Sequence, residues 1–118
     1  PVGKDGTQGF IRALGNGHAM VLLVDLAVSR GDEMPFLGKP AMTSTAAAAF
    51  ALKTNALYLP YFSMRNPDRT SFSVELAAPI DHSTPIEMTA AANRELEARI
   101  ATDPGNWFWI HRRWKPWV

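Results

Sequence analysis

The chain has 118 residues, of which 47% are hydrophobic, and this length and composition favour one compact domain over residues 1–118. It contains no cysteine, so disulfides, thiolate metal sites and a cysteine nucleophile are excluded. The formal net charge of +1 is unevenly divided, because residues 107–118 hold three Lys or Arg and no acid, which leaves nine basic against eleven acidic residues before them.

The first elements expected along the chain are a short helix and a buried strand. Thr7 to Leu14 has one apolar face, a capping threonine and a Gly-rich end, which predicts a helix. Met20 to Val24 is an apolar run too short for an independent helix, so it predicts a strand buried on both faces, in the middle of a sheet. Asp25 follows, where open α/β sheets form their ligand crevice. The alternative is that Asp25 only caps a loop.

The next stretch predicts a helix and a second strand. Residues 29–33 mix flexible and charged side chains, which indicates a mobile loop over the crevice. Thr43 or Ser44 can cap a helix through Thr54 that has almost no polar face and is expected to be buried against a sheet. Residues 57–64 predict a strand, interrupted by Pro60. This order of strand, helix and strand favours a right-handed parallel unit.

The last two elements have clear local signals. A turn at residues 66–68 precedes an alternating strand over residues 71–77, which predicts an antiparallel hairpin. Thr84 to Glu87 is a capping box with proline at the first helical position, and it begins an amphipathic helix that extends to Ile100. The fold class is therefore α/β, a mixed sheet with a parallel β-α-β unit and an antiparallel hairpin, flanked by helices.

The histidines offer little catalytic pattern. His18, His82 and His111 have no metal-site spacing among them, so no metal is expected. His82 and Glu87 have the H-x-x-x-x-E spacing that glycerolipid-type acyltransferases use. The capping box already accounts for Glu87, which makes a helix start the simpler interpretation and a catalytic dyad the alternative.

The four tryptophans lie close together in a basic tail, residues 107–118. Tryptophan mixed with Arg and Lys suits a bilayer headgroup layer. It also suits stacking on single-stranded nucleic acid. The third alternative is ordinary core packing. Because the body of the chain is slightly acidic and has no broad basic patch, nucleic acid is the weakest of the three and is not expected as a partner.

The tail also carries a family resemblance. Residues 104–115, P-G-N-W-F-W-I-H-R-R-W-K, closely resemble the C-terminal signature of the lipid A biosynthesis acyltransferases, and the segments Val21–Asp25, Phe36–Gly38, Ala41–Ala51 and Leu57–Pro60 match further family features in order. The resemblance implies the C-terminal half of a glycerolipid-acyltransferase-like αβ fold, with the catalytic His–carboxylate motif expected upstream of Pro1. Leu26 departs from the family, which usually has Gln or His there.

The resemblance implies a function for the complete enzyme: transfer of a fatty acyl group from acyl carrier protein to a hydroxyacyl chain of a lipid A precursor, without cofactor or metal, at the cytoplasmic face of the inner membrane of Gram-negative bacteria. This chain would be the acceptor-binding half and inactive alone. Its expected substrate-binding residues are Asp25, Arg30, Gly31, Gly38, Arg112 and Arg113, with Arg112 as the crevice-facing arginine. Its expected membrane-interface residues are Trp107, Trp109, Trp114 and Trp117.

Two alternatives to this function stay open. The chain could be a non-catalytic module that binds a membrane surface through the Trp/Arg tail. It could instead be a small self-contained acyltransferase in which His82 and Glu87 form the catalytic dyad.

Overall fold

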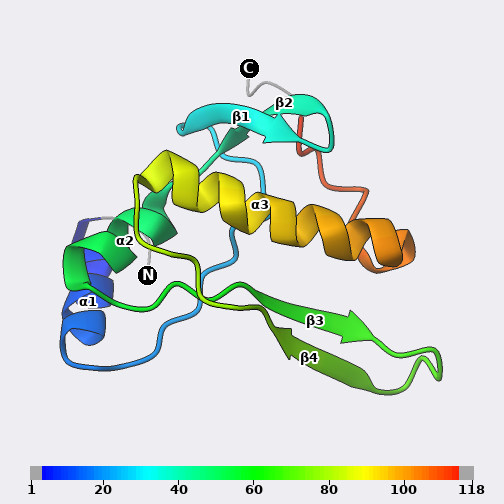
Figure 1. Ribbon diagram of the computed structural model, residues 1–118, viewed down its shortest axis with the longest axis horizontal. Coiled ribbons are helices and arrows are strands. Elements are labelled where there is room, and N and C mark those ends of the chain that lie inside the picture. Colours follow the sequence, from blue (N-terminus) through cyan, green and yellow to red (C-terminus); the bar gives the residue numbers. More distant parts are fainter. Residues whose placement is uncertain (1–3, 115–118) are drawn as a thin grey trace.

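A computed structural model describes residues 4–114 and has a mixed α/β architecture organised around one long helix, α3 (Pro85–Thr102). Two separate antiparallel hairpins lie on opposite sides of this helix (Figure 1). Strands β1 (Asp32–Phe36) and β2 (Lys39–Thr43) form the first hairpin. Strands β3 (Tyr61–Arg65) and β4 (Phe72–Leu76) form the second.

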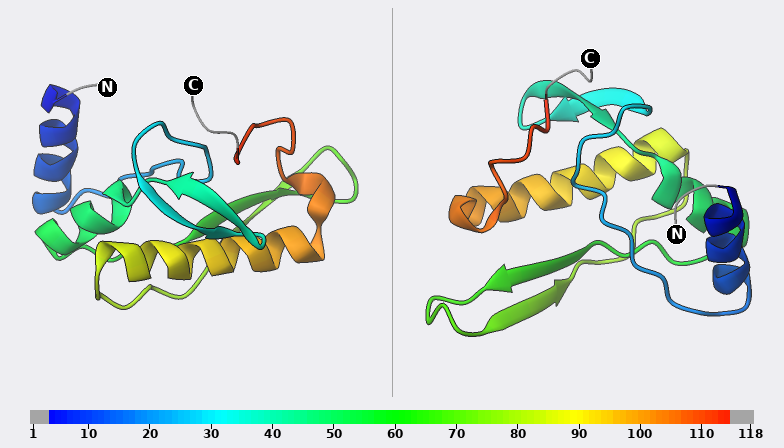
Figure 2. Two further views of the ribbon diagram at one scale, coloured as in Figure 1. Left: turned by 90° about the horizontal axis from the view of Figure 1, so that it is seen from above. Right: turned by 180° about the vertical axis from the view of Figure 1, so that it is seen from behind.

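The remaining elements gather at the two ends of α3. Helices α1 (Lys4–Gly15) and α2 (Ala46–Thr54) lie near its beginning. A short 3-10 helix, η1 (Pro104–Asn106), follows its end, and from there the described tail returns toward the β1–β2 hairpin (Figure 2). The tail therefore contacts residues that precede it by more than half of the chain.

Local signals set the bounds of α3 as the sequence predicts. The Thr84 hydroxyl accepts a hydrogen bond from the Glu87 N–H at 3.2 Å, and the Glu87 carboxylate accepts one from the Thr84 N–H at 3.4 Å. Both halves of the capping box are thus present, with Pro85 at the first helical position. The predicted β3–β4 hairpin is also confirmed, although β3 begins only after Pro60, which cannot donate to a strand ladder.

The β1–β2 hairpin was not predicted and replaces the expected mobile loop. Its two-residue turn consists of Leu37 and Gly38, both with positive φ (48° and 76°), which is the backbone that a tight hairpin requires. Two prolines, Pro35 and Pro40, face each other across the strands. Asp32 and Glu33, expected in the loop, are the first residues of β1.

The predicted strand at Met20–Val24 is wrong for this chain. Residues 18–24 have no regular secondary structure, and Val21 and Leu23 are 74% and 80% exposed. A strand in the middle of a sheet needs a paired strand at each edge, and none of the strands between residues 4 and 114 pairs with this run. The parallel β-α-β unit that depended on it is accordingly not observed.

The apolar core divides into two clusters, one on each part of α3. Phe36, Ala41 and Ile100 form the first, with Leu37, Leu96, Trp107 and Trp114 packed around them. Ala48, Ala51 and Met88 form the second, with Leu52, Tyr58 and Ile80. The alanine-rich helix α2 exists as predicted, but it packs against α3 and α1 and not against a sheet. Its small side chains allow this close helix packing.

Candidate functional site

The most buried charged group of the described chain is Arg113, at 1% exposure. Its Nη1 donates to the Met42 carbonyl at 2.5 Å, and its Nη2 donates to the Thr43 hydroxyl at 2.7 Å. The guanidinium also lies 5.2 Å from the centre of the Phe36 ring. These contacts place the described end of the tail on strand β2 and on the first core cluster.

The electrostatics of Arg113 connect it to Asp25. Burial lowers the pKa of the Arg113 guanidinium, while the nearby Asp25 carboxylate acts in the opposite direction. The two groups form no direct ion pair, since none within 4.0 Å is found between them. Arg113 Nε is buried and has no acceptor among the described residues. Neutral oxygens thus bind the Arg113 guanidinium, and the Asp25 carboxylate offsets only part of its positive charge.

The segment that follows Asp25 is fixed to the tail. The Ala27 N–H donates to Nε2 of His111 at 2.7 Å, across 84 residues of sequence. This bond requires that Nε2 of His111 carry no proton. His111 was not among the expected site residues, although the basic tail drew attention to it. It is the clearest link between the Asp25 segment and the arginines.

The other expected substrate-binding residues are spread over the surface around this cluster. Gly31 lies against β2, where a Cβ atom would collide with the Thr43 carbonyl oxygen. Gly38 is in the exposed turn of the β1–β2 hairpin. Arg30 and Arg112 are both exposed. The structure therefore brings Gly31 and Arg113 together around Thr43, and it leaves Arg30, Gly38 and Arg112 outside this cluster.

The assignment of Arg112 as the inward-facing arginine is wrong, because Arg113 is buried and Arg112 is exposed. That assignment assumed that the tail is a helix, on which Trp109 and Arg112 share a face. Beyond η1, the described tail consists of turns. Arg113 is therefore enclosed in the interior, and Arg112 lies on the surface.

Two of the tail tryptophans pack in the first core cluster. Trp107 and Trp114 lie 5.4 Å and 5.9 Å from Phe36, measured between ring centres. Trp114 Nε1 also donates to the Phe36 carbonyl at 3.1 Å. Trp109 is half-exposed and donates through Nε1 to the Pro104 carbonyl at 2.6 Å. Trp117 lies outside the described residues. Core packing therefore accounts for Trp107 and Trp114.

The His82 and Glu87 side chains contact different groups and not each other. Nε2 of His82 lies 2.8 Å from the Ala56 carbonyl, and Glu87 closes the capping box. No hydrogen bond or ion pair joins the two. A dyad needs its carboxylate on the imidazole to hold the tautomer, and the structure does not provide that contact.

Sequence reasoning missed Thr43 and Asn93. The sequence predicts Thr43 only as a possible helix cap, yet its hydroxyl accepts a hydrogen bond from Arg113. Asn93 is buried in α3, and its Nδ2 has no acceptor among the described residues. A polar residue on the apolar side of the predicted helix was an available signal for Asn93. No signal in the sequence pointed to Thr43.

Metal chemistry and membrane crossing can be assessed for residues 4–114. Within this range, no three side chains of the kinds that bind metals (His, Asp or Glu) are grouped as a metal ion would need. None of its helices combines the length and apolar character that crossing a bilayer requires.

Comparison with known proteins agrees with the resemblance carried by the tail. The family model of the bacterial lipid A biosynthesis acyltransferases matches residues 2–116. The chain is also similar to a lipid A biosynthesis acyltransferase of Haemophilus influenzae, with 29% identity over 115 residues. The aligned region is 92% of this chain and 37% of that relative, so the chain spans well under half the length of the relative.

Proposed function

The chain belongs to the bacterial lipid A biosynthesis acyltransferase family, and on this premise we propose that it forms the acceptor-binding part of an enzyme that acylates a lipid A precursor. The donor is a fatty acyl group on acyl carrier protein, and the acceptor is the hydroxyl of a hydroxyacyl chain. The enzyme acts at the cytoplasmic face of the bacterial inner membrane.

The chemistry needs a general base, and we place it outside residues 1–118, because His82 and Glu87 bind different groups and do not contact each other. A histidine elsewhere in the complete enzyme, with a carboxylate that fixes its tautomer, removes the proton of the acceptor hydroxyl. The hydroxyl oxygen attacks the thioester carbonyl, negative charge develops on that carbonyl oxygen, and the C–S bond to the carrier protein then breaks. No metal or cofactor enters these steps.

One observation carries the assignment of the acceptor side: the Ala27 N–H, two residues after Asp25, donates to Nε2 of His111 at 2.7 Å, although the two residues are 84 positions apart in the sequence. This bond holds the segment that carries Asp25 against the arginine-bearing tail. We propose that the Asp25 carboxylate, which is half-buried, accepts a hydrogen bond from the acceptor. The exposed Arg30 and Arg112 are free to meet phosphate groups of an anionic lipid.

A second candidate function is a non-catalytic module that binds a membrane surface. Phe108, Trp109 and Ile110 are consecutive, and each exposes at least half of its surface. Arg112 is exposed shortly after them. An exposed aromatic and aliphatic run beside a cation is typical of a surface that contacts anionic lipid headgroups.

A transfer assay distinguishes these functions. Labelled acyl groups on acyl carrier protein are offered with a lipid A precursor to the complete enzyme and to residues 1–118 alone. We expect transfer by the complete enzyme and none by residues 1–118. Binding to liposomes without transfer by either protein would support the membrane module. Transfer by residues 1–118 that is lost in His82→Ala would establish the dyad instead.

A further inference from the structure

One face of the β3–β4 hairpin is apolar and uncovered. Cross-strand partners share a face, and the pairs Tyr61–Leu76, Ser63–Val74 and Arg65–Phe72 place four large apolar side chains on the same side. Tyr61, Phe72, Val74 and Leu76 are all exposed. Leu57 and Leu59 extend the pattern before β3, since they alternate with the half-buried Tyr58 and the buried Pro60. We call these six side chains the open face.

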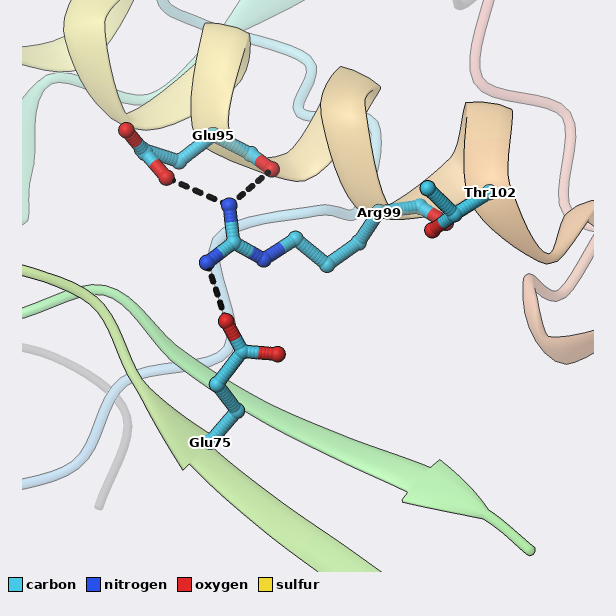
Figure 3. A network of polar contacts seen from close by, with 4 residues as sticks. All are labelled: Glu75, Glu95, Arg99 and Thr102. Carbon is cyan, nitrogen blue, oxygen red and sulfur yellow. Dashed lines mark hydrogen bonds and ion pairs between the residues drawn. The ribbon is translucent and has the colours of Figure 1, made fainter.

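The opposite side of the hairpin contacts α3, which fixes the direction of the open face. Arg99 of α3 donates to Glu75 at 2.5 Å and to Glu95 at 2.5 Å (Figure 3). Its guanidinium also lies 4.7 Å from the centre of the Phe62 ring. The hairpin therefore cannot turn its apolar side toward α3 without breaking this network.

The outer edge of β3 also has unused main-chain groups. In an antiparallel pair, alternate residues direct their N–H and C=O groups away from the partner strand. Asn106 satisfies these groups at Arg65, donating to its carbonyl and accepting from its N–H. At Leu57, Leu59, Tyr61 and Ser63, no described group fills the same role. The main chain of the exposed run Met20–Val24 likewise has no described partner.

A cavity lies between these two unpaired segments. Its volume is about 830 Å³, and its walls include Met20–Val24, residues 57–64 and one side of α3. Asn93, whose buried Nδ2 has no described acceptor, is part of the α3 wall. The site thus offers apolar side chains, main-chain donors and acceptors, and one buried amide donor.

These features together select the kind of partner. Lipid tails can cover apolar side chains, but they cannot accept or donate the hydrogen bonds of an open strand edge. An extended polypeptide satisfies both, because it adds main-chain hydrogen bonds at the edge and side chains over the face. The open face has only Arg65 as a charged neighbour on its strands, at the far end, so an apolar polypeptide suits it.

We propose that the outer edge of β3 and the open face bind an apolar, extended segment of the complete enzyme that lies outside residues 1–118. This inference rests on the proposed function, which places the catalytic base in such polypeptide. The similar Haemophilus influenzae protein has most of its length outside the aligned region. The acceptor-binding and catalytic parts would then share one sheet, with the Met20–Val24 run beside the added segment.

Hydrogen exchange tests the proposal without depending on activity. The amides of residues 20–24 and of Leu57, Leu59, Tyr61 and Ser63 are followed in residues 1–118 alone and in the complete enzyme. We expect exchange of these amides to slow by at least about 100-fold in the complete enzyme. Amides of α3 near Arg99 serve as the control and should be slow in both proteins. Equally fast exchange of the edge amides in both proteins would overturn the proposal.

Two other occupants give different results, and either result would overturn the proposal. Protection that appears only when vesicles are added would identify lipid as the cover. Protection in residues 1–118 that rises with protein concentration would identify a second copy. If the amides are protected in the complete enzyme but no acyl transfer is found, the interface stands and the proposed function fails.

A pair of substitutions gives a second readout. Leu57→Asn places a polar group on the open face, and Ile110→Asn places one on the tail, where the side chain is 85% exposed. We expect both to leave the melting temperature of residues 1–118 unchanged. In the complete enzyme, only Leu57→Asn should lower it, by at least about 5 °C. Equal, small effects of the two in the complete enzyme would show that the open face stays exposed.

Discussion

Nη2 of Arg113 lies 2.7 Å from the Thr43 hydroxyl, and these two buried residues are separated by 70 positions in the sequence. Their contact joins the tail to β2 and encloses the first core cluster, since Phe36 and Trp114 lie beside it. The stability of the chain should therefore depend on the Arg113 side chain. The sequence pattern predicts only a ligand-binding role for it.

Arg113→Lys should destabilise the chain by about 2 kcal/mol, because an ammonium group cannot make both hydrogen bonds and also stack on Phe36. Urea denaturation followed by tryptophan fluorescence measures this change. Arg112→Lys is the matched control and should stay within about 0.5 kcal/mol of the original, because Arg112 is exposed. Equal losses in both variants would contradict the anchoring role of Arg113.

Gly31→Ala should destabilise the chain by about 1 to 3 kcal/mol, since the new methyl group would meet the Thr43 main chain. Gly9→Ala provides a control of opposite sign. Gly9 is inside α1 with no atom near the position of its missing Cβ, so alanine should stabilise the helix by up to about 1 kcal/mol. Thermal melts of the two variants decide whether β2 approaches Gly31 as closely as described.

Glu87→Gln should change neither stability nor activity appreciably, because glutamine retains the acceptor that closes the capping box. Thr84→Ala should cost about 1 kcal/mol, since it removes the other half of the box. The two variants are compared by denaturation and, in the complete enzyme, by acyl transfer. A large loss of transfer in Glu87→Gln without loss of stability would support the His82–Glu87 dyad.

Asp25→Ala in the complete enzyme should lower the rate of acyl transfer at least about tenfold, or about 1.4 kcal/mol of transition-state free energy. The melting temperature should barely change, because Asp25 makes no direct ion pair. Asp5→Ala, on the exposed side of α1, is the control. If activity survives while stability falls, the main effect of Asp25 is to balance the buried Arg113 charge.

Alkaline titration should report the burial of Tyr58, one of the two tyrosines of the chain. Burial raises the pKa of Tyr58 above its ordinary value of 10.0, because the phenolate is less well solvated. Tyr61→Phe leaves Tyr58 as the single phenol, so ultraviolet absorbance should show a midpoint above 10.0. Because the pKa of Tyr58 is raised in the folded state, its contribution to stability is fully present below pH 10.0. This contribution is lost as the pH rises through the folded-state pKa.

The elements with local signals could be predicted, and those set by distant contacts could not. A cap, a proline and a four-residue repeat lie within α3 itself, so its start at Pro85 follows from the sequence. The β1–β2 turn was missed because Leu37 adopts positive φ without being glycine or asparagine. Gly38 in the second turn position was the available signal.

In the candidate site, too, local features could be predicted from the sequence and distant contacts could not. The basic tail could be recognised from its residues, yet its partners on β2 are 70 and 71 positions away, and no local pattern indicates them. Met20–Val24 has every local property of a buried strand. Whether such a run becomes a central strand, however, is decided by the strands that pair with it, and none of the described strands does so.

The facing prolines of the first hairpin have a consequence for self-association. Pro35 and Pro40 have no N–H. They form the pair next to Phe36–Lys39, which closes the turn, and at this second pair the main-chain groups point outward from the hairpin. The outer edges of β1 and β2 therefore each lack an N–H donor at this pair, so a further strand cannot pair there with regular hydrogen bonds. The β3–β4 hairpin has no such block, and it should be the place where unwanted aggregation of the isolated chain begins.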